Sequence, residues 1–109
     1  MDCYGFVLAF YREGLGIELQ DLPSGYGPTA MVRWFHRQRE HWVEVPEPLP
    51  YCAVGMGHRN ITHVGVYHPS GSVLHLSRRG GIIGQHVDVL RASGYSLIQY
   101  YAHRSMLNV

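Results

Sequence analysis

The apolar residues near the start of the chain follow the spacing of a helix. They repeat at intervals of three and four residues, which predicts a helix over residues 3–13. These residues are Phe6, Val7, Phe10 and Tyr11. Asp2 suits the N-cap of this helix, and Gly14 and Gly16 favour an end just beyond it.

A second helix is predicted over residues 28–41, after a loop over residues 15–26. Pro28 fits the first turn of a helix. Arginines and aromatic residues share this segment, so it could present a surface to a partner or a polyanion. An amphipathic helix with a charged outer face explains the same pattern, and we favour that simpler interpretation.

The second half of the chain changes to the period-two alternation of β-strands. It follows a proline-rich segment, residues 46–50, that cannot form regular structure. Strands are predicted over residues 51–56, 62–67, 72–76 and 95–101, with a brief helical turn over residues 87–92. Helices followed by strands are typical of an α+β domain with an antiparallel sheet.

Two of these strands, residues 62–67 and 72–76, are predicted to form a hairpin that brings two histidines together. The residues between them, His68-Pro-Ser-Gly71, are typical of a turn. If the hairpin is symmetric about Pro69, His63 lies directly opposite His75 and their rings share a face. The aliphatic residues then pack on the other face of the hairpin. They are Val64, Val66, Leu74 and Leu76.

The composition mainly excludes classes of protein. The chain has 109 residues, of which 46% are hydrophobic, so we expect one globular domain over residues 1–109. A net charge of +1 is not typical of nucleic-acid-binding domains, which are usually strongly basic. No apolar run is long enough for a membrane span, and no signal peptide precedes Cys3. We therefore expect neither a nucleic-acid partner nor a membrane span.

Cys3 lies where a cysteine becomes reactive. Cysteine attacks as the thiolate, which the free N–H groups and the dipole of a helix N-terminus stabilise. Cys3 falls in the first turn of the predicted helix, although a small apolar residue at a helix start would occupy the same position. Cys52 lies in an apolar strand and is expected to be inert. Two cysteines are too few for a disulfide scaffold.

A thiol nucleophile also needs a base, and facing histidines suit a base and the group that orients it. Cys3, His63 and His75 are therefore the predicted catalytic residues, with the Cys3 thiol close to the His63 ring. One alternative is a pair of partly exposed strand histidines. Another is a zinc site, but His63 and His68 point to opposite faces and do not pair as ligands. We expect no metal and no cofactor.

Three sequence blocks resemble the motifs of one enzyme family. Asp2-Cys-Tyr-Gly-Phe-Val7 resembles the nucleophile motif of the NlpC-type cell-wall cysteine peptidases, which are papain-like and usually have Asp-Cys-Ser-Gly-Phe-Val. His63-Val-Gly-Val-Tyr67 resembles the family's His-Val-Gly-Ile-Tyr strand, and Val73-Leu-His75 resembles the strand that follows it. The blocks occur in the family order and, with the strand up to His103, span nearly the whole chain.

The resemblance implies a fold, a reaction and the role of each residue. The fold is α+β and papain-like, with an N-terminal nucleophile helix packed on a small antiparallel β-sheet. The reaction is hydrolysis of amide bonds in peptidoglycan stem peptides by a cysteine peptidase or amidase. Cys3 is the implied nucleophile, His63 the general base and His75 the orienting residue.

Within this family, Tyr4 and the Leu74-His75 pair are similar to tail-assembly proteins of long-tailed phages. That likeness implies other phage tail proteins as partners, besides peptidoglycan peptide stems. It also implies a location in the virion tail, and the absence of a signal peptide implies the cytoplasm at synthesis. The alternative function is a structural tail-assembly module in which the Cys/His site is weak or unused.

The sequence departs from the family pattern at two places. The family usually has a segment before the nucleophile with a Tyr that helps bind the oxyanion, whereas this chain begins at Met1. The family also has a Gly-Asp-Leu segment entering the first strand, whereas Pro50-Tyr-Cys-Ala-Val54 contains no Asp. We therefore expect a domain that lacks its usual N-terminal segment, and weak hydrolysis from this form.

Overall fold

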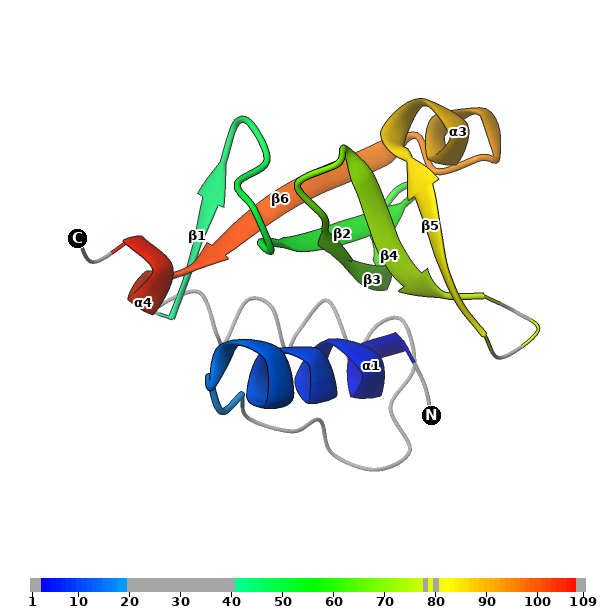
Figure 1. Cartoon of the computed structure of the whole chain (residues 1–109). Helices are drawn as coiled ribbons and strands as arrows, with labels where there is room; N and C mark the ends of the chain where they lie inside the picture. Colours follow the sequence, from blue (N-terminus) through cyan, green and yellow to red (C-terminus); the bar gives the residue numbers. More distant parts are fainter. Residues whose placement is uncertain (1–2, 20–40, 78, 80, 108–109) are drawn as a thin grey trace.

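The computed structural model describes residues 3–19, 41–77, 79 and 81–107, and it shows an α+β molecule built on one antiparallel sheet (Figure 1). In this part of the chain, six strands follow the order β1-β6-β2-β3-β4-β5. They are β1 Trp42–Val45, β2 Ala53–Gly57, β3 Ile61–Tyr67, β4 Ser72–Leu76, β5 Ile82–His86 and β6 Leu97–His103. The predicted α+β class and antiparallel sheet are therefore confirmed.

The predicted N-terminal helix is present as α1 Cys3–Phe10, which continues into a π-helical turn, η1 Tyr11–Leu15. It ends at Gly16, which has a left-handed φ of 68°. The fully buried stripe consists of Tyr4, Val7 and Tyr11. Phe6 and Phe10, which the pattern assigns to the same face, are only half-buried. The buried face is therefore rotated towards Tyr4.

The other predicted elements are found where the structure describes them. Residues 46–50 contain no helix or strand, and α3 Val87–Ala92 is the predicted helical turn. The predicted strands correspond to β2, β3, β4 and β6 within a few residues. The predicted loop over residues 15–26 and helix over residues 28–41 lie mostly outside the described residues.

The sequence pattern does not predict β1, β5 or a short C-terminal helix, α4 Arg104–Leu107. β1 is a four-residue edge strand directly before the proline-rich segment. β5 carries two exposed isoleucines, Ile82 and Ile83, and a glycine in place of apolar alternation. β1 forms because it pairs with β6, and β5 forms because it pairs with β4. This pairing with a distant strand leaves no mark in the local sequence pattern.

β3 and β4 form the predicted hairpin, but the predicted register is wrong by two residues. Val66 pairs with Leu74 and Tyr67 pairs with Val73. The His68 N–H donates to the Ser72 carbonyl over 2.7 Å, so the turn is centred one residue later than Pro69. Gly71 closes this turn with a φ of 97°, which glycine adopts readily.

The corrected register changes the relation between the two histidines without separating them. A shift by an even number of residues leaves every side chain on its predicted face. His63 and His75 therefore still share a face, but they are diagonal neighbours and not directly opposed. Diagonal neighbours are within reach of long or ring-shaped side chains.

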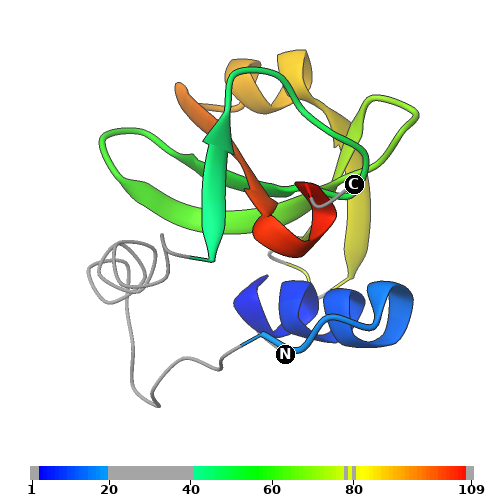
Figure 2. The ribbon, with the colours of Figure 1, turned by 90° about the vertical axis from the view of Figure 1, so that its left-hand side faces the viewer.

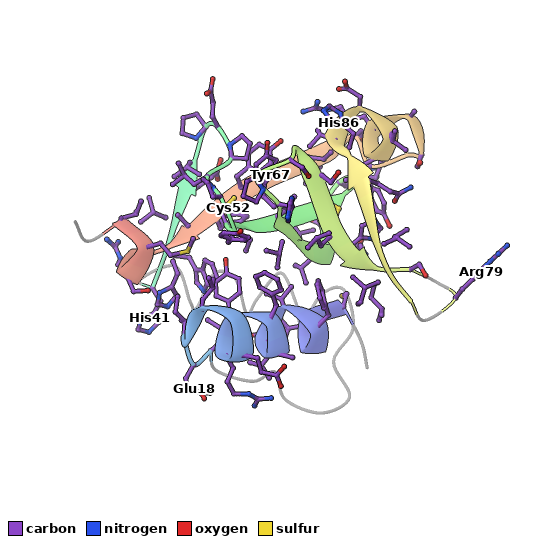
Figure 3. All side chains as sticks on the ribbon, viewed as in Figure 1. Glu18, His41, Cys52, Tyr67, Arg79 and His86 are labelled. Atoms are coloured by element: carbon purple, nitrogen blue, oxygen red, sulfur yellow. The ribbon has the colours of Figure 1, made fainter. Side chains whose placement is uncertain are left out.

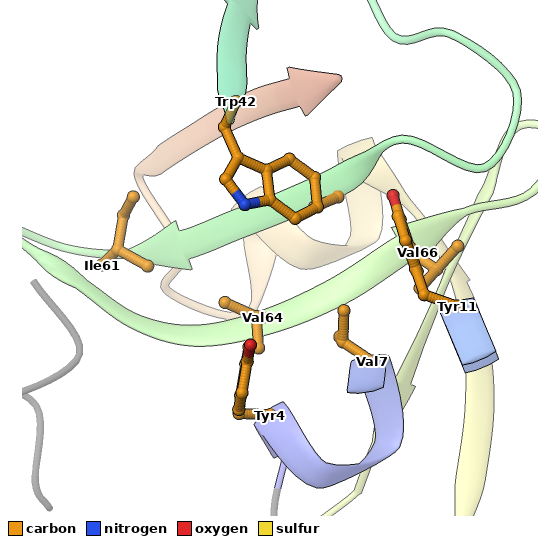
Figure 4. Packing of buried hydrophobic residues seen from close by; sticks show 8 residues of the cluster. Tyr4, Val7, Tyr11, Trp42, Ile61, Val64 and Val66 are labelled. Carbon is orange, nitrogen blue, oxygen red and sulfur yellow. The ribbon is translucent and has the colours of Figure 1, made fainter. Parts of the chain in front are cut away.

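Two apolar clusters lie on opposite faces of the sheet. On one face, α1 packs on β3 through Tyr4, Val7, Val64 and Val66 (Figure 4). On the other face, Met56 and Val73 belong to a cluster with Val87 and Leu90 of α3. Figures 1 and 2 show the helices on these two sides, with α1 beneath the sheet and α3 above it. Each buried aliphatic side chain contributes about 1.5–3 kcal/mol, which holds the sheet and α1 in place.

Candidate active site

A cavity of about 820 Å³ opens at the end of the sheet where β3 begins and β4 ends. The three predicted catalytic residues all line it: Cys3 from α1, His63 from β3 and His75 from β4. Gln85 of β5 and Tyr95, which precedes β6, also line it. Residues from four different elements therefore line one cavity.

The two histidines form a hydrogen-bonded pair in this cavity. Nε2 of His63 lies 2.9 Å from Nδ1 of His75, and the rings meet edge-to-face with centroids 5.0 Å apart. His75 is buried, with 5% of its surface exposed, whereas His63 is half-buried. The prediction that the two imidazoles are neighbours is therefore confirmed.

Gly65 makes room for the histidine pair. The corrected register places Gly65 opposite His75, between His63 and the turn. A Cβ atom on Gly65 would lie 2.6 Å from the Leu74 carbonyl oxygen and 3.1 Å from Cβ of His75. Because no side chain occupies this point, the His75 ring can extend diagonally along the strand to His63.

Two further residues complete the surroundings of the pair, and sequence reasoning does not find either of them. The side-chain oxygen of Gln85 lies 2.7 Å from Nε2 of His75. The Tyr95 ring lies nearly parallel to that of His63, with centroids 6.0 Å apart. Gln85 reaches the site because β5 pairs with β4, placing Gln85 opposite Val73. In the sequence, the only feature that marks Gln85 is its polar side chain, and the surrounding segment has no strand pattern.

The cavity makes His63 a neutral group at pH 7. Burial lowers the pKa of His63 to about 4, and the neighbouring His75 adds to this effect. A neutral imidazole has a free lone pair and can accept a proton. Since the pKa is low, however, the ring holds that proton weakly, so the surroundings favour a neutral thiol and imidazole at rest.

Cys3 approaches the cavity from the other side of the sheet. α1 packs on the face of β3 that carries Val64 and Val66, whereas His63 lies beside Met56 on the opposite face. The cavity connects the two faces around the end of the sheet, since Thr62 also lines it. Cys3 is half-buried there, at the first residue of α1.

The two ring nitrogens of His63 differ in their hydrogen bonds. Its Nε2 is used by His75, and Nδ1 has no hydrogen-bond partner among the residues that the structure describes. Catalytic hydrogen bonds often form fully only when substrate is bound. A proton acceptor and a thiol thus line the same cavity, whereas the closeness of the Cys3 thiol to the His63 ring stays a prediction.

Cys52, by contrast, lies in the interior of the molecule (Figure 3). Its side chain is fully buried, and burial raises the pKa of its thiol to about 11. Cys52 lies directly before β2 and not within a strand, and the inertness of its thiol stays a prediction. Within the described residues, no disulfide links the two cysteines.

The remaining candidates have separate surroundings. His68 bonds to Ser70 within its own turn, at 2.7 Å, and His58 bonds to Ser96, also at 2.7 Å. Arg79, in the loop after β4, extends away from the body of the molecule (Figure 3). Within the described ranges, no three His, Cys, Asp or Glu side chains gather as a metal site. No helix in those ranges is long and apolar enough to cross a bilayer.

Comparisons with known proteins add no relative. No protein-family model, curated protein or solved structure matches the chain.

Proposed function

We propose that this chain is a cysteine peptidase or amidase in which Cys3 is the nucleophile, His63 the general base and His75 the orienting residue. The observation that carries the proposal is the 2.9 Å hydrogen bond between His63 and His75 in a cavity that Cys3 also lines. A thiol with a base that is itself held by a third group is what nucleophilic catalysis requires.

In the proposed reaction, Sγ of Cys3 bonds to the carbonyl carbon of the substrate, and the thiol proton passes to Nδ1 of His63. His63 then gives this proton to the leaving amine as the C–N bond breaks, which leaves a thioester on Cys3. Water that is deprotonated by His63 hydrolyses the thioester and restores the thiol. The backbone N–H of Cys3, at the start of α1, is the proposed donor to the oxyanion.

The motifs around the site suggest a fold family and a substrate class. A helix that begins at the nucleophile and packs on an antiparallel sheet carrying the base is compatible with a papain-like fold. The segments around Cys3, His63 and His75 resemble those of NlpC-type peptidases. On this basis we propose amide bonds in peptidoglycan stem peptides as the substrates, and a phage tail as the setting.

A second candidate is a structural module of a phage tail in which the site is not used. The observation that favours it is the pKa of His63, which burial lowers to about 4. An imidazole that is so weakly basic does not stabilise a thiolate at rest by forming an imidazolium beside it. In this case Cys3 would react like an ordinary thiol and no stem peptide would be cleaved.

Hydrolysis of defined stem peptides separates the two candidates. The purified chain is incubated with peptidoglycan stem tetrapeptides and pentapeptides, and the products are identified by mass spectrometry. We expect cleavage by the native chain and by Cys52→Ala, and a loss of at least about 100-fold in Cys3→Ser. Equal cleavage by Cys3→Ser would overturn the proposal. No cleavage by any form, with ordinary reactivity of Cys3, would overturn the proposal and favour the structural module.

A further inference from the structure

The hydrogen bonds of the histidine pair continue to a third side chain. Nε2 of His63 meets Nδ1 of His75, and Nε2 of His75 meets Oε1 of Gln85 at 2.7 Å. The three residues come from β3, β4 and β5, which are consecutive strands of the sheet. A neutral imidazole that donates from one nitrogen accepts at the other, so each hydrogen bond fixes the donor and acceptor of the next. The role of the Gln85 side chain therefore determines the roles of both histidines.

An amide oxygen can only accept a hydrogen bond, so Nε2 of His75 must carry the hydrogen. A neutral imidazole has a single N–H, which leaves Nδ1 of His75 as an acceptor. Nε2 of His63 must then donate to it. Nδ1 of His63 is consequently left with the lone pair, and this is the nitrogen that the thiol of Cys3 needs.

The same direction also suits the protonated state. When His63 takes up a proton at Nδ1, its Nε2 still carries a hydrogen and still donates to His75, so no bond in the chain has to reverse. A donor in place of the Gln85 oxygen would produce the opposite result. Nδ1 of His75 would then carry the hydrogen, and Nδ1 of His63 would be protonated and useless as a base.

The sheet holds Gln85 in this role. Gln85 pairs with Val73, and His75 pairs with Ile83, so Gln85 and His75 are diagonal neighbours on one face. The Gln85 side chain is half-buried in the cavity wall. Its reach to His75 therefore comes from strand pairing and not from a flexible loop.

We infer that Gln85 is a positioning residue that sets the tautomers of His75 and His63, so that Nδ1 of His63 is the proton acceptor. This inference rests on the proposed function for its chemical consequence. The tautomers themselves exist whether or not the chain hydrolyses anything. The two claims can therefore fail separately.

Nitrogen-15 NMR of the imidazole rings at pH 7.5 tests the inference directly. We expect His63 and His75 of the native chain to carry their hydrogens on Nε2. Gln85→Glu, which keeps an accepting oxygen, should keep both tautomers. Gln85→Met, of similar size but without the amide, should give a mixture and slow the alkylation of Cys3 about tenfold.

The outcomes separate a positioning role from a purely structural one. A native His63 protonated on Nδ1 overturns the inference, and this measurement needs no variant to fold. Unchanged tautomers in a folded Gln85→Met also overturn it. If the tautomers follow the expectation but no stem peptide is cleaved, the inference stands and the proposed function fails.

Discussion

At the scale of single residues, the two cysteines have opposite surroundings. Cys52 is fully buried with a pKa raised to about 11, whereas Cys3 is half-buried at the cavity. At pH 7.5 we expect iodoacetamide to modify Cys3 at least about 100 times faster than Cys52, because the thiolate is the reactive form. Peptide mass spectrometry after brief labelling measures the ratio. Equal rates in the folded protein would contradict the assignment.

His63 should be the residue on which turnover depends most after Cys3. A positioned base typically contributes about 100–10,000-fold to the rate, so His63→Gln should lower the cleavage of stem peptides by that range. His58 provides a matched control, because it lines the same cavity but bonds to Ser96. His58→Gln should remain near the native rate. A similar loss in both variants would mean that the cavity merely needs histidines for its shape.

The sequence predicts Cys3, His63 and His75 as candidates because each depends on local information. Strand alternation assigns both histidines to one face, and the helix pattern places Cys3 at a helix start. Gln85 and Tyr95 depend on partners that are distant in the sequence or on a loop conformation. No local periodicity marks such residues, so only the structure identifies them.

At the scale of elements, the β3–β4 hairpin determines the geometry of the site. The residues between the two strands predict a turn, but the centre of the turn depends on the backbone conformation at Gly71, which composition does not specify. The predicted register differs from the observed one by two residues, so alternation still keeps both histidines on one face. The face of a strand is thus more predictable than its exact register.

Gly65 provides a test of this element. Gly65→Ala would place a Cβ atom 2.6 Å from the backbone oxygen of Leu74, which cannot move without disturbing the hairpin. We expect a loss of about 1–3 kcal/mol in the free energy of unfolding, measured with urea, together with a weakened histidine pair. Gly81→Ala is the control, since its Cβ would meet nothing within 4 Å. Equal stability of the two variants would contradict the packing described around His75.

At the scale of the whole molecule, the fold class followed from the order of helical and strand patterns, but the sheet's edges did not. β1 and β5 form the two edges and depend on pairing with β6 and β4. Because the sequence pattern does not predict β5, it does not predict the wall of the cavity that β5 forms. The cavity itself arises where α1 and three strand ends meet, which is a property of the complete fold.

The buried His63 should make the stability of the molecule depend on pH. Its pKa is about 4 in the folded chain and 6.5 when unperturbed, so between these values only the unfolded chain takes up the proton. The free energy of unfolding should therefore fall as the pH drops from 7 to 4. The share due to His63 is on the order of 2 kcal/mol, because the ring keeps partial contact with solvent.

Urea unfolding of the native chain and of His63→Gln from pH 7 to pH 4 measures the contribution of His63 to the free energy of unfolding. The free energy of unfolding of the native chain, minus that of His63→Gln, should decrease as the pH falls and level off below about pH 4. His103, whose pKa burial also lowers, acts equally in both proteins and cancels. Parallel curves for the two proteins would show that His63 is not desolvated in the folded state.

The pH dependence of Cys3 alkylation shows whether Cys3 is an activated nucleophile. In a Cys52→Ala background, the rate of reaction with iodoacetamide is measured from pH 4 to pH 10. We predict an apparent pKa clearly below 8.5, because Cys3 lies in the first turn of α1, where free N–H groups and the helix dipole favour the thiolate. An apparent pKa at or above 8.5 would contradict the account and leave Cys3 an ordinary thiol at the start of a helix.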